Sequence, residues 1–99
     1  MYGVVRNYKG NRELADQLER RSDEVEELIS TIEGFHSYYL VRTDDGCLTV
    51  SVYQDKSGAD ESTRRAADWL KEHASEITAS TPEVMSGEVL IQTTAGARV

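Results

Sequence analysis

Trp69 and His73 are the residues of this sequence best suited to chemistry. They stand one helical turn apart in a segment predicted to be helical, so both lie on the same side of it. Imidazole carries a proton near neutral pH, and indole offers a large aromatic face. Asn7, late in a predicted strand, and Ser22, on another predicted helix, add an amide and a hydroxyl. All four could border one cavity between helices and sheet, a usual place for a small-molecule site.

Each of these residues also has an ordinary structural explanation. Trp69 can pack at a helix–sheet seam, and His73 can be stabilised by the dipole at its helix C-terminus. Asn7 can bond the turn that follows its strand, and Ser22 can fill a tight contact where the apolar stripe of its helix is interrupted. The shared cavity also requires Asn7 to face the helices. The strand alternation leaves this open, because the two adjacent valines before it suit either face.

The apolar pattern predicts the order strand, helix, strand, strand, helix, strand. Right-handed crossovers then place the third strand between the first two. The expected fold is α+β and ferredoxin-like (βαββαβ), a four-stranded antiparallel sheet with both helices on one face. The predicted segments are strands at 2–8 and 88–94, a hairpin within 34–56, and helices over 12–32 and 58–76, the second capped by Ser57.

The central hairpin turns at Asp45-Gly46, a dipeptide that suits a type I′ turn. Alternation along its strands separates two faces. We expect the first to cover the core and the second to be the helix-free face. The first carries Phe35, Tyr39, Val41, Leu48, Val50 and Val52, and the second carries His36, Tyr38, Leu40, Arg42, Cys47, Thr49, Ser51 and Tyr53.

The expected helix-free face is too apolar to stay in water. Leaving a large apolar side chain exposed forfeits about 1.5–3 kcal/mol, and Tyr38, Leu40 and Tyr53 all belong to this face. Something should therefore cover it. The candidates are a second subunit, a ligand or a nucleic acid.

Composition excludes several classes of function. The chain of 99 residues has a formal net charge of −7, which disfavours a nucleic-acid partner. The third strand also lacks the basic, glycine and aromatic pattern of an RNA-recognition motif. With one cysteine and two histidines, no spacing resembles a metal site. We expect a single domain at 1–95 with a frayed tail at 96–99, no membrane span, no signal peptide and a cytoplasmic location.

The chain resembles the antibiotic-biosynthesis-monooxygenase-like (ABM-like) family of the dimeric α+β barrel superfamily. The resemblance implies a homodimer whose helix-free faces meet and close a barrel, with Tyr38, Leu40 and Tyr53 at the interface. It also implies a pocket between helices and sheet in each subunit. The similar segments are Gly34-Phe35, Tyr38–Arg42, the Asp-Gly hairpin, Tyr53–Lys56, Pro82–Val84 and Gly87–Val89.

Some members of this family oxidise aromatic polyketides without a cofactor, and others degrade haem. By this resemblance Asn7 would hydrogen-bond a phenolate or carbonyl oxygen, Trp69 would stack on the ring and His73 could shuttle a proton. The haem-degrading branch places its ligand histidine several turns beyond the tryptophan, so we expect no cofactor here. The alternative is a non-catalytic dimer that binds a small molecule or only shares the scaffold. Residues expected to line the pocket are Ser22, Phe35 and Tyr39.

Overall fold

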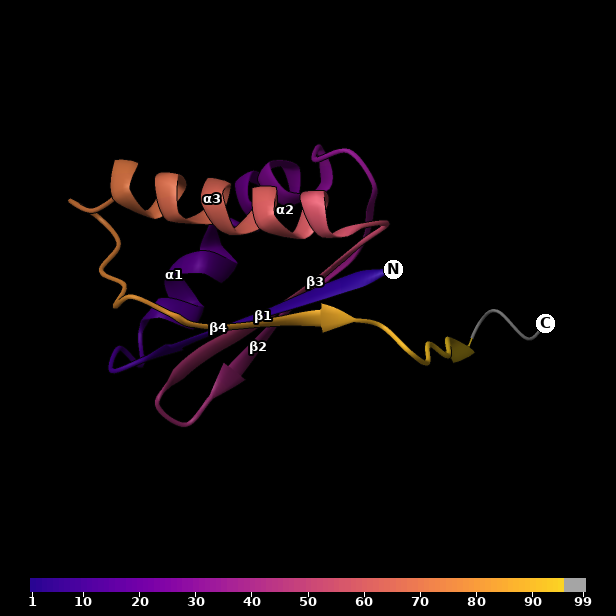
Figure 1. The fold of residues 1–99 in the computed structure, drawn as a ribbon. Coiled ribbons are helices and arrows are strands. Elements are labelled where there is room, and N and C mark those ends of the chain that lie inside the picture. Colours follow the sequence, from indigo (N-terminus) through magenta and orange to yellow (C-terminus); the bar gives the residue numbers. More distant parts are fainter. Residues whose placement is uncertain (96–99) are drawn as a thin grey trace.

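The computed structural model describes residues 1–95, which form one sheet covered on one face by helices (Figure 1). The sheet order is β2-β3-β1-β4, and every neighbouring pair is antiparallel. The predicted ferredoxin-like fold is confirmed. The elements are β1 (Tyr2–Lys9), α1 (Leu14–Arg20), α2 (Ser22–Ser30), β2 (Phe35–Thr43), β3 (Gly46–Tyr53), α3 (Lys56–Glu72) and β4 (Glu83–Glu88).

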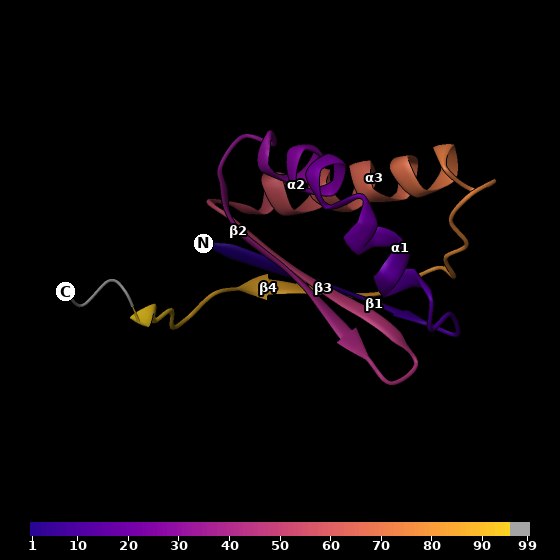
Figure 2. The same cartoon turned by 180° about the vertical axis from the view of Figure 1, so that it is seen from behind.

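The first predicted helix is two helices that meet at Arg21. The backbone there leaves the helical region, with φ −113° and ψ 29°. No glycine or proline causes the break. It falls in the gap of the apolar stripe, because Leu18 and Val25 are buried and the residues between them are not. Two short helices thus each keep an apolar face on the sheet, and both views show them inclined to each other (Figures 1 and 2).

The second helix and the last strand begin earlier than predicted. Asp55, not Ser57, caps α3, and its carboxylate accepts the Gly58 N–H at 3.3 Å. The last strand, predicted at 88–94, lies at Glu83–Glu88 and pairs with β1. The predicted tail at 96–99 lies outside the described residues. No helix within residues 1–95 has the length and apolar character to cross a membrane.

The hairpin turns one residue earlier than predicted. Thr43 pairs with Gly46 and Arg42 pairs with Cys47, so Asp44 and Asp45 occupy the turn. Gly46 is needed for a close approach rather than for a positive φ. A Cβ at this position would lie 2.1 Å from the Tyr8 carbonyl oxygen of the neighbouring strand.

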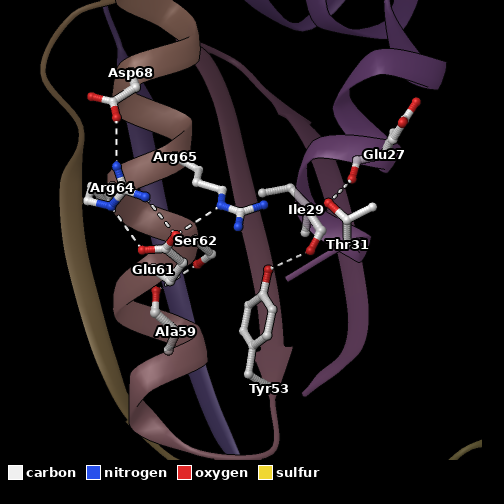
Figure 3. Close-up of polar contacts among 10 residues, drawn as sticks. All are labelled: Glu27, Ile29, Thr31, Tyr53, Ala59, Glu61, Ser62, Arg64, Arg65 and Asp68. Carbon is white, nitrogen blue, oxygen red and sulfur yellow. Dashed lines mark hydrogen bonds and ion pairs between the residues drawn. The ribbon is translucent and has the colours of Figure 1, made fainter. Parts of the chain in front are cut away.

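The two faces of the hairpin are the reverse of the prediction. Tyr53 is fully buried against the helices, where its hydroxyl donates to the Ile29 carbonyl at 3.1 Å (Figure 3). Tyr38 and Leu40 also pack into the core. The prediction that these three residues lie on the helix-free face is therefore wrong. The grouping by alternation holds from Ser37 onward, whereas a β-bulge between Phe35 and Ser37 leaves Phe35 on the core side, where it was predicted, beside Tyr53. The small polar residues of the second group accept a buried arginine, as described below.

The helix-free face carries other apolar side chains than those expected. Tyr39 is 60% exposed, Met85 58% and Val41 44%. The register places Val5 between Val50 and Met85 across the middle of the sheet. The helix-free face is therefore still too apolar to stay in water, although the residues that make it so are not the predicted ones. We call this set the apolar sheet face: Val5, Tyr39, Val41, Leu48, Val50, Val52 and Met85.

Candidate functional site

Arg6 lies between the two apolar clusters of the core. Along β1, Val4 belongs to one cluster and Tyr8 to the other, with Arg6 between them on the same side. Only 1% of its surface is exposed. A guanidinium is a cationic group with five N–H donors and no acceptor. The centre of the helix–sheet layer therefore contains a cation.

Neutral hydroxyl groups hold the Arg6 guanidinium. Nη1 donates to Ser62 Oγ at 3.1 Å and to Thr63 Oγ1 at 3.2 Å, and Nη2 donates to Ser51 Oγ at 3.1 Å. Ser62 in turn donates to the Ala59 carbonyl at 2.7 Å (Figure 3). This leaves the lone pairs of its oxygen to accept from Arg6. Within residues 1–95, no carboxylate pairs with Arg6.

Two buried polar atoms beside the site have no hydrogen-bond partner within residues 1–95. They are Arg6 Nε and Thr49 Oγ1. Both residues border a cavity of about 30 Å³ between α2, α3 and the sheet. Such a volume holds roughly one or two water molecules or one small polar group. Its remaining walls are Tyr8, Leu18, Val25, Leu28, Ile29, Tyr38, Ala66, Trp69 and Leu70.

A larger pocket adjoins this cavity on the β4 side. Its volume is about 220 Å³, and it shares Arg6, Tyr8 and Leu70 with the smaller cavity. Exposed residues on its rim, such as Val84, open it to solvent. An engineered protein cavity of about 150 Å³ binds benzene, so this pocket is large enough for one aromatic ring. The other lining residues are Thr63, Ala67, Thr81 and Pro82.

Three buried tyrosines lie near enough to the cation to feel its charge. Burial raises the pKa of Tyr8 and of Tyr38, and the charge of Arg6 opposes the rise in both. Burial also raises the pKa of Tyr53. The phenols thus stay protonated at neutral pH. They can donate hydrogen bonds, but none supplies a negative charge to Arg6.

Trp69 is the one predicted catalytic residue that borders the cavity. His73 stacks on it, with ring centroids 4.2 Å apart, but does not line the cavity. His73 Nδ1 lies 2.8 Å from the Trp69 carbonyl oxygen, and since a carbonyl only accepts, Nδ1 carries the proton. Its Nε2 lies 3.7 Å from Glu24 Oε2. His73 therefore supports Trp69 from outside the cavity.

The other predicted site residues lie elsewhere. Asn7 follows Arg6 on β1 and lies on the opposite face, next to Leu48 of the apolar sheet face. Tyr39 is on that face too, and Ser22 is exposed at the start of α2. Phe35 packs edge-on against Tyr53, with ring centroids 5.9 Å apart, outside both pockets. The structure does not bring these residues together with Trp69.

Sequence reasoning missed Arg6, Tyr8 and Thr49. The small polar residues of β3 could have indicated the buried arginine. Thr49 and Ser51 pack poorly in an apolar core, but they leave room for a long cationic side chain. Ser62 on α3 matches them from the other side. Within residues 1–95, no group of three or more acidic, histidine or cysteine side chains is placed to hold a metal ion.

Comparisons with known proteins agree with this architecture. A point mutant of MhuD, solved with two manganese protoporphyrin IX molecules per active site, matches with a TM-score of 0.74 and 13% identity over 96% of this chain and 100% of that one. MhuD from Mycobacterium tuberculosis, described as a heme-degrader and solved with two hemes, gives 0.66 and 14% over 95% and 100%.

The NE2512 protein of unknown function from Nitrosomonas europaea gives a TM-score of 0.70 and 14% identity over 94% of this chain and 92% of that one. At such identities these likenesses show the fold alone. A search of curated proteins found no match. The sequence profile described as Antibiotic biosynthesis monooxygenase matches residues 1–67. The chain belongs to the antibiotic biosynthesis monooxygenase family.

Proposed function

We propose that this protein binds a small aromatic molecule between its helices and its sheet and oxidises it with molecular oxygen, without a cofactor. The observation that carries the proposal is the pair of adjoining pockets, which combine apolar walls, the Trp69 indole and the buried cation Arg6. Apolar walls with a few convergent polar groups are typical of small-molecule sites. The family of the chain supports oxygen chemistry for such a site.

The chemistry requires a substrate that ionises readily, such as an anthrone. Its CH2 group loses a proton to solvent, which gives an enolate, and the enolate passes an electron to oxygen. Recombination forms a peroxide, and loss of water leaves a quinone, so one oxygen atom enters the product and the other leaves as water. Arg6 favours the enolate over the neutral form, because a nearby positive charge stabilises an anion most strongly where water is excluded. Trp69 borders the cavity beside Arg6 and forms part of the apolar wall that keeps water from the enolate oxygen.

We also propose that the protein is a homodimer joined through the apolar sheet face. Monomers rarely expose a contiguous apolar patch this rich without using it. The residues that support the proposal are Tyr39, Val41 and Met85, each more than 40% exposed, and not the buried tyrosines. A dimer of this kind leaves the pockets on the outer, helix-covered side of each sheet.

Haem does not fit the residues of this site. His73 is turned toward its own helix and lies outside the cavity lining. The cavity beside Trp69 has a volume of only about 30 Å³, and the Arg6 cation lines it. Haem is therefore not part of the proposed reaction. Titration with haem should give no shifted Soret band, whereas a shifted band that is lost in His73→Ala would contradict this reading.

Oxygen uptake with dithranol, an anthrone, tests the proposed reaction. The wild type should consume oxygen faster than buffer, and Trp69→Leu should lose most of this rate while retaining its fold by circular dichroism. Tyr2→Phe, a change at an aromatic residue that lines neither pocket, is the control and should keep the rate.

A rate equal to buffer, together with measurable dithranol binding, would favour the second candidate, a non-catalytic binding protein. That candidate is supported by the same pockets, since apolar walls and one cation suffice to bind an aromatic molecule.

A further inference from the structure

Arg6 is a buried charge without a counter-ion, and this is the least explained feature of the molecule. Removing a charged group from water costs several kcal/mol unless an opposite charge or strong hydrogen bonds compensate. Its three partners are neutral hydroxyl groups, and Nε–H has none. A methionine or leucine would fill the same space at lower cost. A group outside the described chain is therefore the best candidate for the missing negative charge.

The cavity beside Arg6 is shaped for a small charged group rather than for a ring. At about 30 Å³ it matches the size of one or two water molecules, which is also that of a carboxylate or a phenolate oxygen. The unpartnered Thr49 hydroxyl borders the same space and can donate a second hydrogen bond. Ring and charge thus have separate places, because the adjoining pocket of about 220 Å³ has room for a ring and the cavity of about 30 Å³ does not.

We propose that Arg6, with Thr49, binds the anionic oxygen of a small aromatic ligand, a carboxylate or a phenolate, whose ring occupies the pocket between α3, β1 and β4. The inference rests on the proposed function in one respect, that the ligand is a small aromatic molecule. It adds that the molecule binds as an anion. Tyr8 and Tyr38 remain protonated and line the same cavity, so they donate hydrogen bonds rather than compete for the charge.

The test compares benzoate with its neutral analogue benzamide by isothermal titration calorimetry. Charge-assisted hydrogen bonds are about twice as strong as neutral ones, so the wild type should bind benzoate roughly tenfold or more tightly. Arg6→Gln keeps amide donors but loses the charge and should abolish this preference. Arg64→Gln removes an exposed arginine of α3 that pairs with Glu61 and Asp68, and should retain it.

Two further measurements use the wild type and test the inference even if the Arg6→Gln chain does not fold. In the wild type, benzoate should shift the Arg6 Nε–H resonance and benzamide should not. 4-Nitrophenol, buffered below its own pKa, should turn yellow on binding if the site takes a phenolate, and benzoate should displace it. If benzoate binds and the dye stays colourless, the ligand is a carboxylate.

Equal affinity for benzoate and benzamide, or a preference that survives in Arg6→Gln, would overturn the inference. These outcomes do not depend on oxygen uptake. Binding of benzoate through Arg6 with no oxidation of dithranol would refute the proposed reaction alone. Oxidation without any preference for anions would refute the anion site alone.

Discussion

Replacing Tyr39 by threonine should separate the proposed dimer without unfolding the subunit. Threonine suits a β-strand, and Tyr39 is 60% exposed, so the subunit loses little beyond its cross-strand contact with Val50, which is worth about 0.2–1 kcal/mol. A tyrosine has roughly 150–250 Å² of surface to bury. If the dimer buries the exposed 60% of this surface, at about 25 cal/mol per Å², each Tyr39 contributes about 2–4 kcal/mol to the free energy of association.

Two copies meet in each dimer, so Tyr39→Thr should weaken association by a factor of about 10³ or more, taking the lower end of that range. Sedimentation velocity at micromolar concentration is the assay. The wild type should sediment as a dimer of the 11.1 kDa chain and the variant as a monomer. Ser30→Thr, on the exposed side of α2, is the control and should remain dimeric. A wild type that sediments as a monomer, or a Tyr39→Thr dimer of unchanged affinity, would refute the reasoning.

Three other predictions follow from single contacts. Gly46→Ala should destabilise the chain by about 1–3 kcal/mol in urea unfolding, because its Cβ would overlap the Tyr8 carbonyl, whereas Gly87→Ala, with open space around it, should change stability by less than about 0.5 kcal/mol. Arg64 and Arg65 lower the pKa of Glu61 to about 2, so this carboxylate contributes stability that is full above its ordinary pKa and is lost as the pH falls toward 2. In Glu61→Gln, stability should therefore fall less steeply between the ordinary pKa of a glutamate and pH 2. An unchanged curve would show that the ion pairs of Glu61 with Arg64 and Arg65 do not stabilise the fold. Burial raises the pKa of the Cys47 thiol to about 11, so iodoacetamide at pH 8 should label the native chain at least ~10²-fold more slowly than the urea-unfolded chain, and equal rates would show that Cys47 is accessible.

The element order was predictable because it depends on long, periodic patterns. Helical spacing of apolar residues and the Asp-Gly turn located the helices and the hairpin to within a few residues. The break at Arg21 was harder to foresee, since no glycine or proline marks it. Only the gap between Leu18 and Val25 in the apolar stripe indicated it.

The orientation of the sheet could not be settled from alternation alone. Both hairpin faces contain aromatic and aliphatic residues, and the more apolar one was assigned to the core. The core side instead carries Thr49 and Ser51, because Arg6 needs hydroxyl partners there. A buried arginine breaks the rule that charged residues face water, and this exception reversed the predicted faces of the hairpin strands β2 and β3.

The candidate site was only partly predictable for the same reason. Trp69 was found because its type and helical position both favour a pocket wall. A site role for Asn7 required it to face the helices, which the alternation of β1 left open, and the structure places it on the other face. Arg6, the immediate neighbour of Asn7, occupies the position that Asn7 was expected to fill.

The central claim, that ligands bind between helices and sheet around Arg6, can be tested by mapping ¹H–¹⁵N chemical shifts during a benzoate titration. The account predicts that the largest changes occur at the Trp69 indole and at the amides of Tyr8 and Thr49, all of which border the cavity. Changes confined to Val50 and Met85 would place the ligand on the apolar sheet face and contradict the account.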